Sequence, residues 1–223
     1  MSEIEYLCDA ILFDLDGVLV DSIGCTERAW RSWAEARGVD VVRTLQVSHG
    51  RPVKDTLRLL VPQLDTATEV AYLEAIEAHE TEGVRAVAGA HALLARLPPA
   101  SWAIVTSATR SVAELRLRHT GLHAPDVLVT ADDISRGKPD PEGYLTAAAR
   151  LGIEPSACLV IEDAVAGIDA ARAAGMRVIA ITSTRRADEL RRADGVVSAL
   201  TDLEVVGIAV PLRVRDAGTA HMR

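Results

Sequence analysis

The sequence lacks three features: a long hydrophobic run, closely spaced cysteines and an excess of basic charge. Its apolar runs stay well below the roughly 18 residues of a membrane-spanning helix. The first nine residues contain three acids but no lysine or arginine, unlike a secretory signal. A net charge of −8 argues against a general nucleic-acid-binding protein. We therefore expect neither a membrane nor a nucleic-acid partner.

The three cysteines, Cys8, Cys25 and Cys158, are far apart and form no C-x-x-C pair. We expect them to be buried, reduced thiols, which favours a cytoplasmic location. Pairs of histidine and cysteine with the spacing of zinc ligands are also missing from the sequence. Zinc is therefore disfavoured as a cofactor.

Strand-like and helix-like segments alternate through most of the chain. Short apolar runs predict strands at 11–13, 101–106, 127–130, 158–161, 177–181 and 196–197. Periodic segments predict helices at 89–97, 109–119, 141–151, 164–174 and 186–193, and we expect the last dozen residues to be frayed. The alternation is typical of α/β proteins with a doubly wound parallel sheet that helices cover on both faces.

Residues 22–82 interrupt this alternation, since they show no strand pattern. Helices are predicted at 23–38, 53–61 and 66–81, while residues 44–50 break the helical pattern. The chain of 223 residues therefore divides into an α/β core, residues 1–20 and 84–223, and a helical cap, residues 21–83, inserted after the first strand.

Polar residues follow several of the predicted strands, at the sheet edge where sites form in α/β proteins. They lie in four separate loops, at Asp14 and Asp16, at Thr106 and Ser107, at Lys138, and at Glu162 and Asp163. Four loops that converge on one crevice indicate a functional site more strongly than any single motif.

Asp14 and Asp16 start on the same face of a strand, where two ionised carboxylates repel each other unless a cation relieves the repulsion. Asp14 fits either a nucleophile that accepts a phosphoryl group or a passive metal ligand. Asp16 fits either a general acid and base or a turn-forming residue before Gly17.

Glu162 and Asp163 fit either acids that complement a helix dipole or part of a metal site with Asp14 and the backbone carbonyl of Asp16. Mg²⁺ suits such a site, because it favours one or two carboxylates, water and a phosphate oxygen.

Lys138, between Gly137 and Pro139, fits either a solvated surface charge or a cation that neutralises phosphoryl oxygens. Thr106 and Ser107 fit donors to a phosphate, although Ser107 taken alone also fits an ordinary N-cap of the next helix.

The chain carries these residues in four motifs that resemble those of the haloacid dehalogenase superfamily of phosphohydrolases, in the subfamily with a small helical cap. The motifs are Asp14-Leu-Asp16-Gly-Val-Leu-Val-Asp21-Ser22, Val105-Thr106-Ser107, Gly137-Lys138-Pro139 and Ile161-Glu162-Asp163-Ala-Val-Ala-Gly167-Ile168. Segments 48–52, 77–83 and 102–107 look like those of the sugar and polyol phosphatases, which include hexitol, 2-deoxyglucose-6-phosphate and glycerol-phosphate phosphatases.

The resemblance implies that Asp14 is the nucleophile and Asp16 the general acid and base. It also implies that Asp14, the Asp16 carbonyl and Asp163 hold Mg²⁺, with Glu162 as a supporting acid or a ligand through water.

The resemblance further implies that Thr106, Ser107 and Lys138 bind the transferred phosphoryl group, with either hydroxyl as its main donor. In the cap, the candidate substrate contacts are His49, Gly50 and Arg51, although His49 also fits a packing role.

Thr26 departs from the β-phosphoglucomutase branch of the family, which has a histidine at this cap position. The arginine that this branch uses for a second phosphate would fall near Val53, so both positions disfavour a mutase. Asp16 argues against dehalogenase chemistry, because dehalogenases lack this second acid.

We therefore expect a monomeric, Mg²⁺-dependent phosphatase that hydrolyses a small phosphorylated sugar or polyol through an aspartyl phosphate. A phosphomutase on the same scaffold is the first alternative. The second is a non-catalytic module that signals through a phosphorylated aspartate, which the helical insert disfavours because receiver domains have no such segment.

Overall fold

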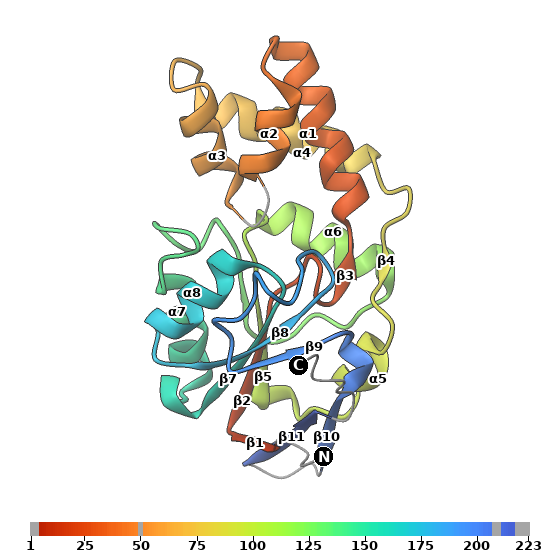
Figure 1. Ribbon diagram of the computed structural model, residues 1–223. Coiled ribbons are helices and arrows are strands. Elements are labelled where there is room, and N and C mark those ends of the chain that lie inside the picture. Colours follow the sequence, from red (N-terminus) through yellow and green to blue (C-terminus); the bar gives the residue numbers. More distant parts are fainter. Residues whose placement is uncertain (1–4, 49–50, 207–210, 217–223) are drawn as a thin grey trace.

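A computed structural model describes residues 5–48, 51–206 and 211–216 of the chain. The described residues form an α/β core with a group of helices above it (Figure 1). Among these residues, no helix is long and apolar enough to cross a membrane.

The core is built on a six-stranded parallel sheet with the strand order β6-β5-β2-β7-β8-β9. Its strands are β2 (Ala10–Phe13), β5 (Trp102–Val105), β6 (Leu128–Val129), β7 (Cys158–Glu162), β8 (Arg177–Ile181) and β9 (Gly195–Val197). The predicted fold class, a parallel sheet covered by helices, is confirmed.

The central strands are apolar on both faces, because helices cover both faces of the sheet. Ile11 and Phe13 of β2 pack into one hydrophobic cluster, with α5 (Ala90–Leu94) and α6 (Arg110–Thr120). Ala10 and Leu12 pack into the other, with α7 (Glu142–Leu151) and α8 (Val165–Ala173). The alternation of side chains along the strand therefore separates the core into two layers, and Figure 1 shows the helices of these layers on the two sides of the sheet.

A second, antiparallel sheet lies at the end of the core opposite the helical group (Figure 1). It joins β1 (Glu5–Cys8), β11 (Leu212–Asp216) and β10 (Leu203–Val206). The prediction of a frayed end is wrong for residues 212–216, because Leu212 and Val214 are buried in the core. Residues 217–223 lie outside the described part.

Four helices between β3 and β4 form a separate layer, which we call the cap: α1 (Ile23–Arg37), α2 (Val41–Ser48), α3 (Val53–Leu60) and α4 (Thr66–His79). The cap has its own hydrophobic cluster, in which the rings of Trp30 and Trp33 meet edge to face at 5.5 Å between centroids.

The prediction that residues 44–50 break the helical pattern is wrong up to Ser48, which ends α2. The Asp40 side chain accepts a hydrogen bond from the Arg43 backbone N–H at 3.0 Å, as an N-cap does. Val41 and Leu45 pack against the cap cluster. Local capping and packing therefore stabilise a short helix that the sequence pattern conceals.

The chain leaves the core through β3 (Val20–Asp21) and returns through β4 (Arg85–Ala86), and these two strands pair with each other. An ion pair of 2.8 Å between Arg85 and Asp21 lies across the pair. The predicted domain limits of 21–83 for the cap stay a prediction.

The predicted helix at 186–193 is wrong. Residues 186–193 form successive turns, with backbone hydrogen bonds between residues three apart, for example from the Glu189 N–H to the Arg186 carbonyl oxygen. Leu190 is the one fully buried residue of this segment, and Ala193 packs against the same cluster, so the apolar contacts are too few to pack a helical face.

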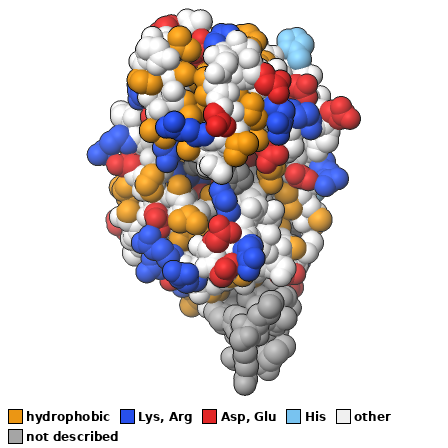
Figure 2. Space-filling view, turned by 45° about the horizontal axis from the view of Figure 1, so that its top comes forward, with side chains coloured by type: hydrophobic (Ala, Val, Ile, Leu, Met, Phe, Trp, Pro, Cys, Tyr) orange, Lys and Arg blue, Asp and Glu red, His pale blue; other side chains and the backbone are white. Residues whose placement is uncertain are grey.

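On the face shown in Figure 2, acidic and basic side chains are interspersed, with hydrophobic side chains between them.

Candidate active site

The polar loops predicted from the sequence do meet at the carboxyl edge of the parallel sheet. Asp14 directly follows β2, Thr106 follows β5, and Glu162 ends β7 with Asp163 beside it. Lys138 reaches the same point from the loop before α7, and all these residues line one pocket beneath the cap.

The Lys138 ammonium group is buried and uses all three of its protons. Its Nζ lies 2.7 Å from Asp14 Oδ1, 2.6 Å from Glu162 Oε1 and 3.2 Å from the Val105 carbonyl oxygen. Burial opposes the charge, but attraction to Asp14 and Glu162 prevails and raises the pKa of Lys138 well above its usual value. Lys138 is therefore a permanent cation, and the interpretation as a solvated surface charge is wrong.

Glu162 is completely buried, and both of its oxygens are occupied. Besides Lys138, Oε1 accepts a hydrogen bond from the Tyr144 hydroxyl at 2.9 Å. Oε2 accepts the backbone N–H groups of Asp163 and Ala164 at 2.8 and 3.0 Å. Burial raises the pKa of Glu162, but Lys138 and these N–H groups outweigh it and hold the pKa below its usual value. Glu162 thus anchors Lys138.

Gly167 makes room for this anchor. A Cβ atom at position 167 would lie 1.6 Å from Glu162 Oε1, so any side chain there would displace the buried carboxylate. Packing against Glu162 therefore explains why the fourth sequence motif has a glycine at position 167.

Asp14, Glu162 and Asp163 bring one carboxylate oxygen each to within 4.8 Å of one another. Burial raises the pKa of Asp14 to about 7, although the charge of Lys138 opposes this. Burial, together with the charges of Glu162 and Asp14, raises the pKa of Asp163 well above its usual value. Three buried acids face one lysine, so the donor set has room for a further cation.

The chemistry of this donor set fits a divalent metal ion. Asp14 and Asp163 are the stronger candidate ligands, because the oxygens of Glu162 already have protein partners. Asp163 Oδ2 also accepts a hydrogen bond of 2.6 Å from the Thr184 hydroxyl, which sequence reasoning missed. Gly17 allows the Asp163 carboxylate to lie close to the backbone at position 17, since a Cβ atom there would lie 2.1 Å from Asp163 Oδ2.

The Asp16 side chain has different partners from Asp14. Oδ1 accepts the Ser22 hydroxyl at 2.5 Å, and Oδ2 accepts Nη1 of Arg116 at 2.6 Å. The two acids of the first motif are therefore in different environments: one beside Lys138 and one beside an arginine. The Asp16 carbonyl as a metal ligand stays a prediction.

Arg116 is the main residue of the pocket that sequence reasoning missed. It lies in α6 and is buried, with ion pairs to Asp16 and to Glu77 of α4. The signal was present in the sequence, because Arg116 stands four residues after Val112, in the buried stripe of its helix. A charged residue in such a stripe needs a buried partner.

Thr106 and Ser107 both line the pocket. Thr106 is buried, and its hydroxyl oxygen accepts the Ala108 N–H at 3.0 Å, which leaves its proton for another acceptor. The N-cap position of α6 is Thr109, so the alternative role of Ser107 as the N-cap is wrong.

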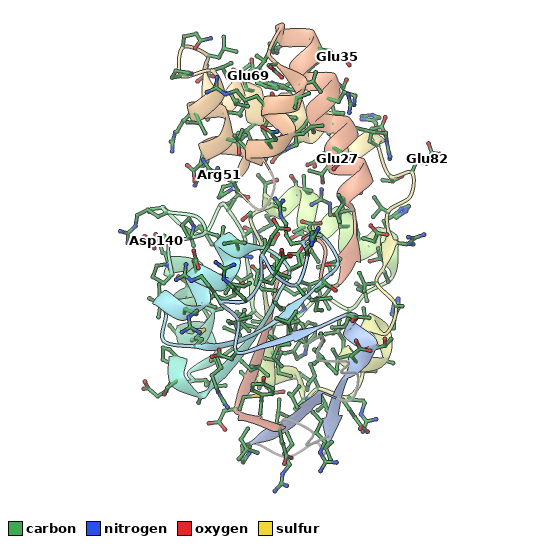
Figure 3. The ribbon with its side chains drawn as sticks, viewed as in Figure 1. Glu27, Glu35, Arg51, Glu69, Glu82 and Asp140 are labelled. Atoms are coloured by element: carbon green, nitrogen blue, oxygen red, sulfur yellow. The ribbon has the colours of Figure 1, made fainter. Side chains whose placement is uncertain are left out.

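The cap closes the other side of the pocket with Thr26, Glu27, Trp30, Leu45, Ser48, Arg51, Val53, Leu73, Glu74 and Glu77 among the lining residues. Figure 3 shows Glu27 and Arg51 on the edge of the cap that faces the core. Of the three predicted cap residues, Arg51 lies at the pocket, whereas His49 and Gly50 are outside the described residues.

Fold and site together define a capped α/β hydrolase with an acidic, lysine-containing centre. A model of the haloacid dehalogenase-like hydrolases matches residues 8–175. The chain is 44% identical to hexitol phosphatase A of Escherichia coli, over 89% of this chain and 94% of that protein. It is 36% identical to 2-deoxyglucose-6-phosphate phosphatase 1 of Saccharomyces cerevisiae, over 91% and 92%.

A crystal structure of a hydrolase from Pseudomonas syringae superposes with a TM-score of 0.75 at 28% identity, covering 85% of this chain and 93% of that one. The chain belongs to the haloacid dehalogenase-like hydrolase family. The predicted family is confirmed, and the predicted enzyme class, a phosphoric monoester hydrolase, agrees with the names of these relatives.

Proposed function

We propose that this protein is a Mg²⁺-dependent phosphatase that hydrolyses a small phosphorylated sugar or polyol. The observation that carries the proposal is the position of Asp14, which Lys138 holds at 2.7 Å at the base of a pocket covered by the cap. A carboxylate held in this way is oriented for in-line attack on a phosphorus atom.

In the first step, an Asp14 oxygen forms a bond to phosphorus, and the bond from phosphorus to the ester oxygen breaks. Asp16, which lines the same pocket, gives a proton to the departing alkoxide. In the second step, Asp16 takes a proton from water, whose oxygen attacks the phosphorus, so that inorganic phosphate leaves and Asp14 is regenerated.

Charge neutralisation and positioning supply the remainder of the catalysis. Lys138 lines the pocket with its positive charge, which would neutralise charge on the transferred group, and the hydroxyls of Thr106 and Ser107 would donate hydrogen bonds to it. Asp14 and Asp163 would hold Mg²⁺, which when bound neutralises charge on the phosphoryl oxygens.

The relatives named above support the choice of a sugar or polyol phosphate as substrate. The cap side of the pocket also suits a hydroxyl-rich leaving group. Its lining includes the carboxylates of Glu27 and Glu74, the Ser48 hydroxyl, the Arg51 guanidinium and the ring of Trp30. Carboxylates accept hydrogen bonds from neighbouring hydroxyls, and an aromatic ring packs on the apolar side of a sugar.

A phosphomutase is the second candidate function. Thr26 lies at the pocket where the resemblance places the cap histidine of mutases, and its hydroxyl already accepts a hydrogen bond of 2.9 Å from Arg116. A hydroxyl group cannot serve as an acid and base at neutral pH as a histidine does. Hydrolysis is therefore the better-supported reaction.

The test is a phosphate-release assay over hexose, pentose, hexitol and glycerol phosphates, with Mg²⁺ and with EDTA. We expect release with Mg²⁺ from at least one of these esters and none after chelation, with activity restored by added Mg²⁺. Exchange of phosphoryl groups between sugar phosphates without release would favour the mutase. The cytoplasmic location and the monomeric state stay predictions, and analytical ultracentrifugation checks the second.

A further inference from the structure

Arg116 joins the cap to Asp16 in a single hydrogen-bonded network that is partly buried. Its Nη1 donates to Asp16 Oδ2 at 2.6 Å, and its Nη2 donates to Glu77 Oε1 and to the Thr26 hydroxyl oxygen, both at 2.9 Å. Arg116 and Asp16 belong to the core, whereas Thr26 lies in α1 and Glu77 in α4 of the cap. One guanidinium group thus spans the boundary between the two parts.

The network leaves little freedom to its members. The Arg116 side chain is only 7% exposed and that of Glu77 only 10%. The second Asp16 oxygen is taken by the Ser22 hydroxyl at 2.5 Å. A guanidinium group is a planar fork with fixed donor directions, and breaking a buried pair leaves an uncompensated charge. Movement of Glu77 relative to the core therefore has to turn Arg116, and with it Asp16.

From these contacts we propose that Arg116 is a positioning residue, which couples the place of the cap, through Glu77 and Thr26, to the orientation of the Asp16 carboxylate. The inference rests on the proposed function, in which Asp16 transfers a proton to the leaving group. Arg116 does not touch the reacting atoms in this scheme. It determines whether Asp16 stands where the ester oxygen departs.

The leaving group provides the first test. Kinetics on the wild type and Arg116→Met compare the best alkyl phosphate of the substrate panel with p-nitrophenyl phosphate. The ratio kcat/KM reports the transfer to Asp14, in which only the alkoxide needs a proton. We expect R116M to lower kcat/KM about 100-fold for the alkyl ester, as for a misplaced catalytic group, and to change it less than about threefold for the aryl ester.

A double-mutant cycle with Asp16→Asn provides the second test. If Arg116 acts through Asp16, adding R116M to D16N changes kcat/KM for the alkyl ester by less than about threefold. Equal losses on both esters, or losses that multiply in the double variant, overturn the proposal. A purely structural role would give one of these two outcomes.

Two gentler variants keep the proposal testable if R116M does not fold. Glu77→Gln keeps the shape of the side chain and leaves Arg116 paired with Asp16, and Arg116→Lys keeps the charge without the fork. For both variants we expect values of kcat/KM for the alkyl ester between those of the wild type and R116M, with a smaller effect on the aryl ester. A loss of kcat/KM on the aryl ester alone contradicts the proposal.

Arg118→Met is the matched control, because Arg118 lies on the same helix but is exposed, 3.5 Å from Glu114. We expect unchanged kinetics on both esters for R118M. A wild-type protein that releases no phosphate from either ester overturns the proposed function, and the inference with it. A wild type that is active, with R116M indistinguishable from R118M, overturns the inference alone.

Discussion

The core and the cap line the same pocket with side chains held in different ways. On the core side, Lys138, Asp14 and Glu162 are buried and bound to one another at 2.6–2.7 Å. On the cap side, Glu27 and Arg51 are exposed at the pocket edge (Figure 3). Buried charges that already have all their partners are preorganised, and the proposed phosphoryl transfer requires such preorganisation whichever ester is bound. Exposed side chains such as these can change without loss of the fold, which allows the leaving group to vary.

The two parts also touch on either side of the pocket. On one side, Arg116 meets Glu77 as described above. On the other, Lys54 of the cap donates hydrogen bonds of 3.2 Å to the carbonyl oxygens of Ala131 and Ile134 in the core. A Cβ on Gly137 would lie 2.0 Å from Cγ of Pro52, so the cap packs directly on the loop that carries Lys138. The cap therefore contacts the core on both sides of the pocket, at Arg116 and beside the loop that carries Lys138.

The largest expected effect comes from the core. Asp14→Asn removes the proposed nucleophile but keeps the size of the side chain beside Lys138. We expect phosphate release to fall by about 10⁴-fold or more, as for other lost nucleophiles, while the thermal unfolding curve stays cooperative. Steady-state phosphate release measures the effect. Appreciable turnover by D14N would rule out covalent catalysis by Asp14.

Gly167→Ala tests the core at a position that does not touch the substrate. The added methyl group would collide with Glu162 Oε1, at 1.6 Å, and separate this carboxylate from Lys138. We expect the free energy of unfolding to fall by about 3 kcal/mol, the scale of a broken buried ion pair, together with loss of activity. Urea denaturation measures the change.

Gly24→Ala is the control for this substitution, because Gly24 lies in a cap helix where an added Cβ atom would have Nη1 of Arg28, at 3.4 Å, as its nearest neighbour. There we expect unchanged or slightly higher stability, by up to about 1 kcal/mol. Equal destabilisation by G167A and G24A would show that the Glu162 anchor is not sensitive to packing.

The cap is expected to respond in affinity rather than in chemistry. Arg51→Ala and Glu27→Gln should raise KM for the preferred substrate by about tenfold, the value of one hydrogen bond, with little change in kcat. The KM for p-nitrophenyl phosphate should be unaffected, because this ester has no hydroxyl-rich group. A fall in kcat without a change in KM would contradict the division of labour between the cap and the core.

The smallest effect concerns Asp133, remote from the catalytic cluster. Burial would raise its pKa, but hydrogen bonds from Thr130 and Arg150 and the charge of Arg110 lower it from 3.8 to about 2. A lowered pKa contributes stability above pH 3.8, and this contribution is lost as the pH falls through 2. The difference in urea midpoint between the wild type and Asp133→Asn should be constant from neutral pH to about pH 5 and vanish near pH 2. A difference that grows on acidification would contradict this assignment.

Much of the core could be predicted, because its signals are local. Apolar runs of strand length ending in acids or hydroxyls indicated the sheet and the edge where the site forms. The short helix α2 and the turns at 186–193 could not be predicted in the same way. The first depends on packing against the cap cluster, and the second on the way Leu190 and Ala193 pack against the core. Arg116 escaped notice because its partners, Asp16 and Glu77, lie 100 and 39 residues away.

By itself, the sequence determined which chemical groups the site contains and the class of enzyme they define. Asp14, Asp16 and Asp163 stand in motifs that follow strands of the sheet, and Lys138 stands in a motif of the loop before α7. Only the tertiary structure decided how these groups are paired. It placed Lys138 between Asp14 and Glu162 and paired Asp16 with Arg116. It also placed the cap over the pocket that these residues line. Hydrogen bonds and ion pairs depend on distances of about 3 Å, which arise only when segments far apart in the chain pack together.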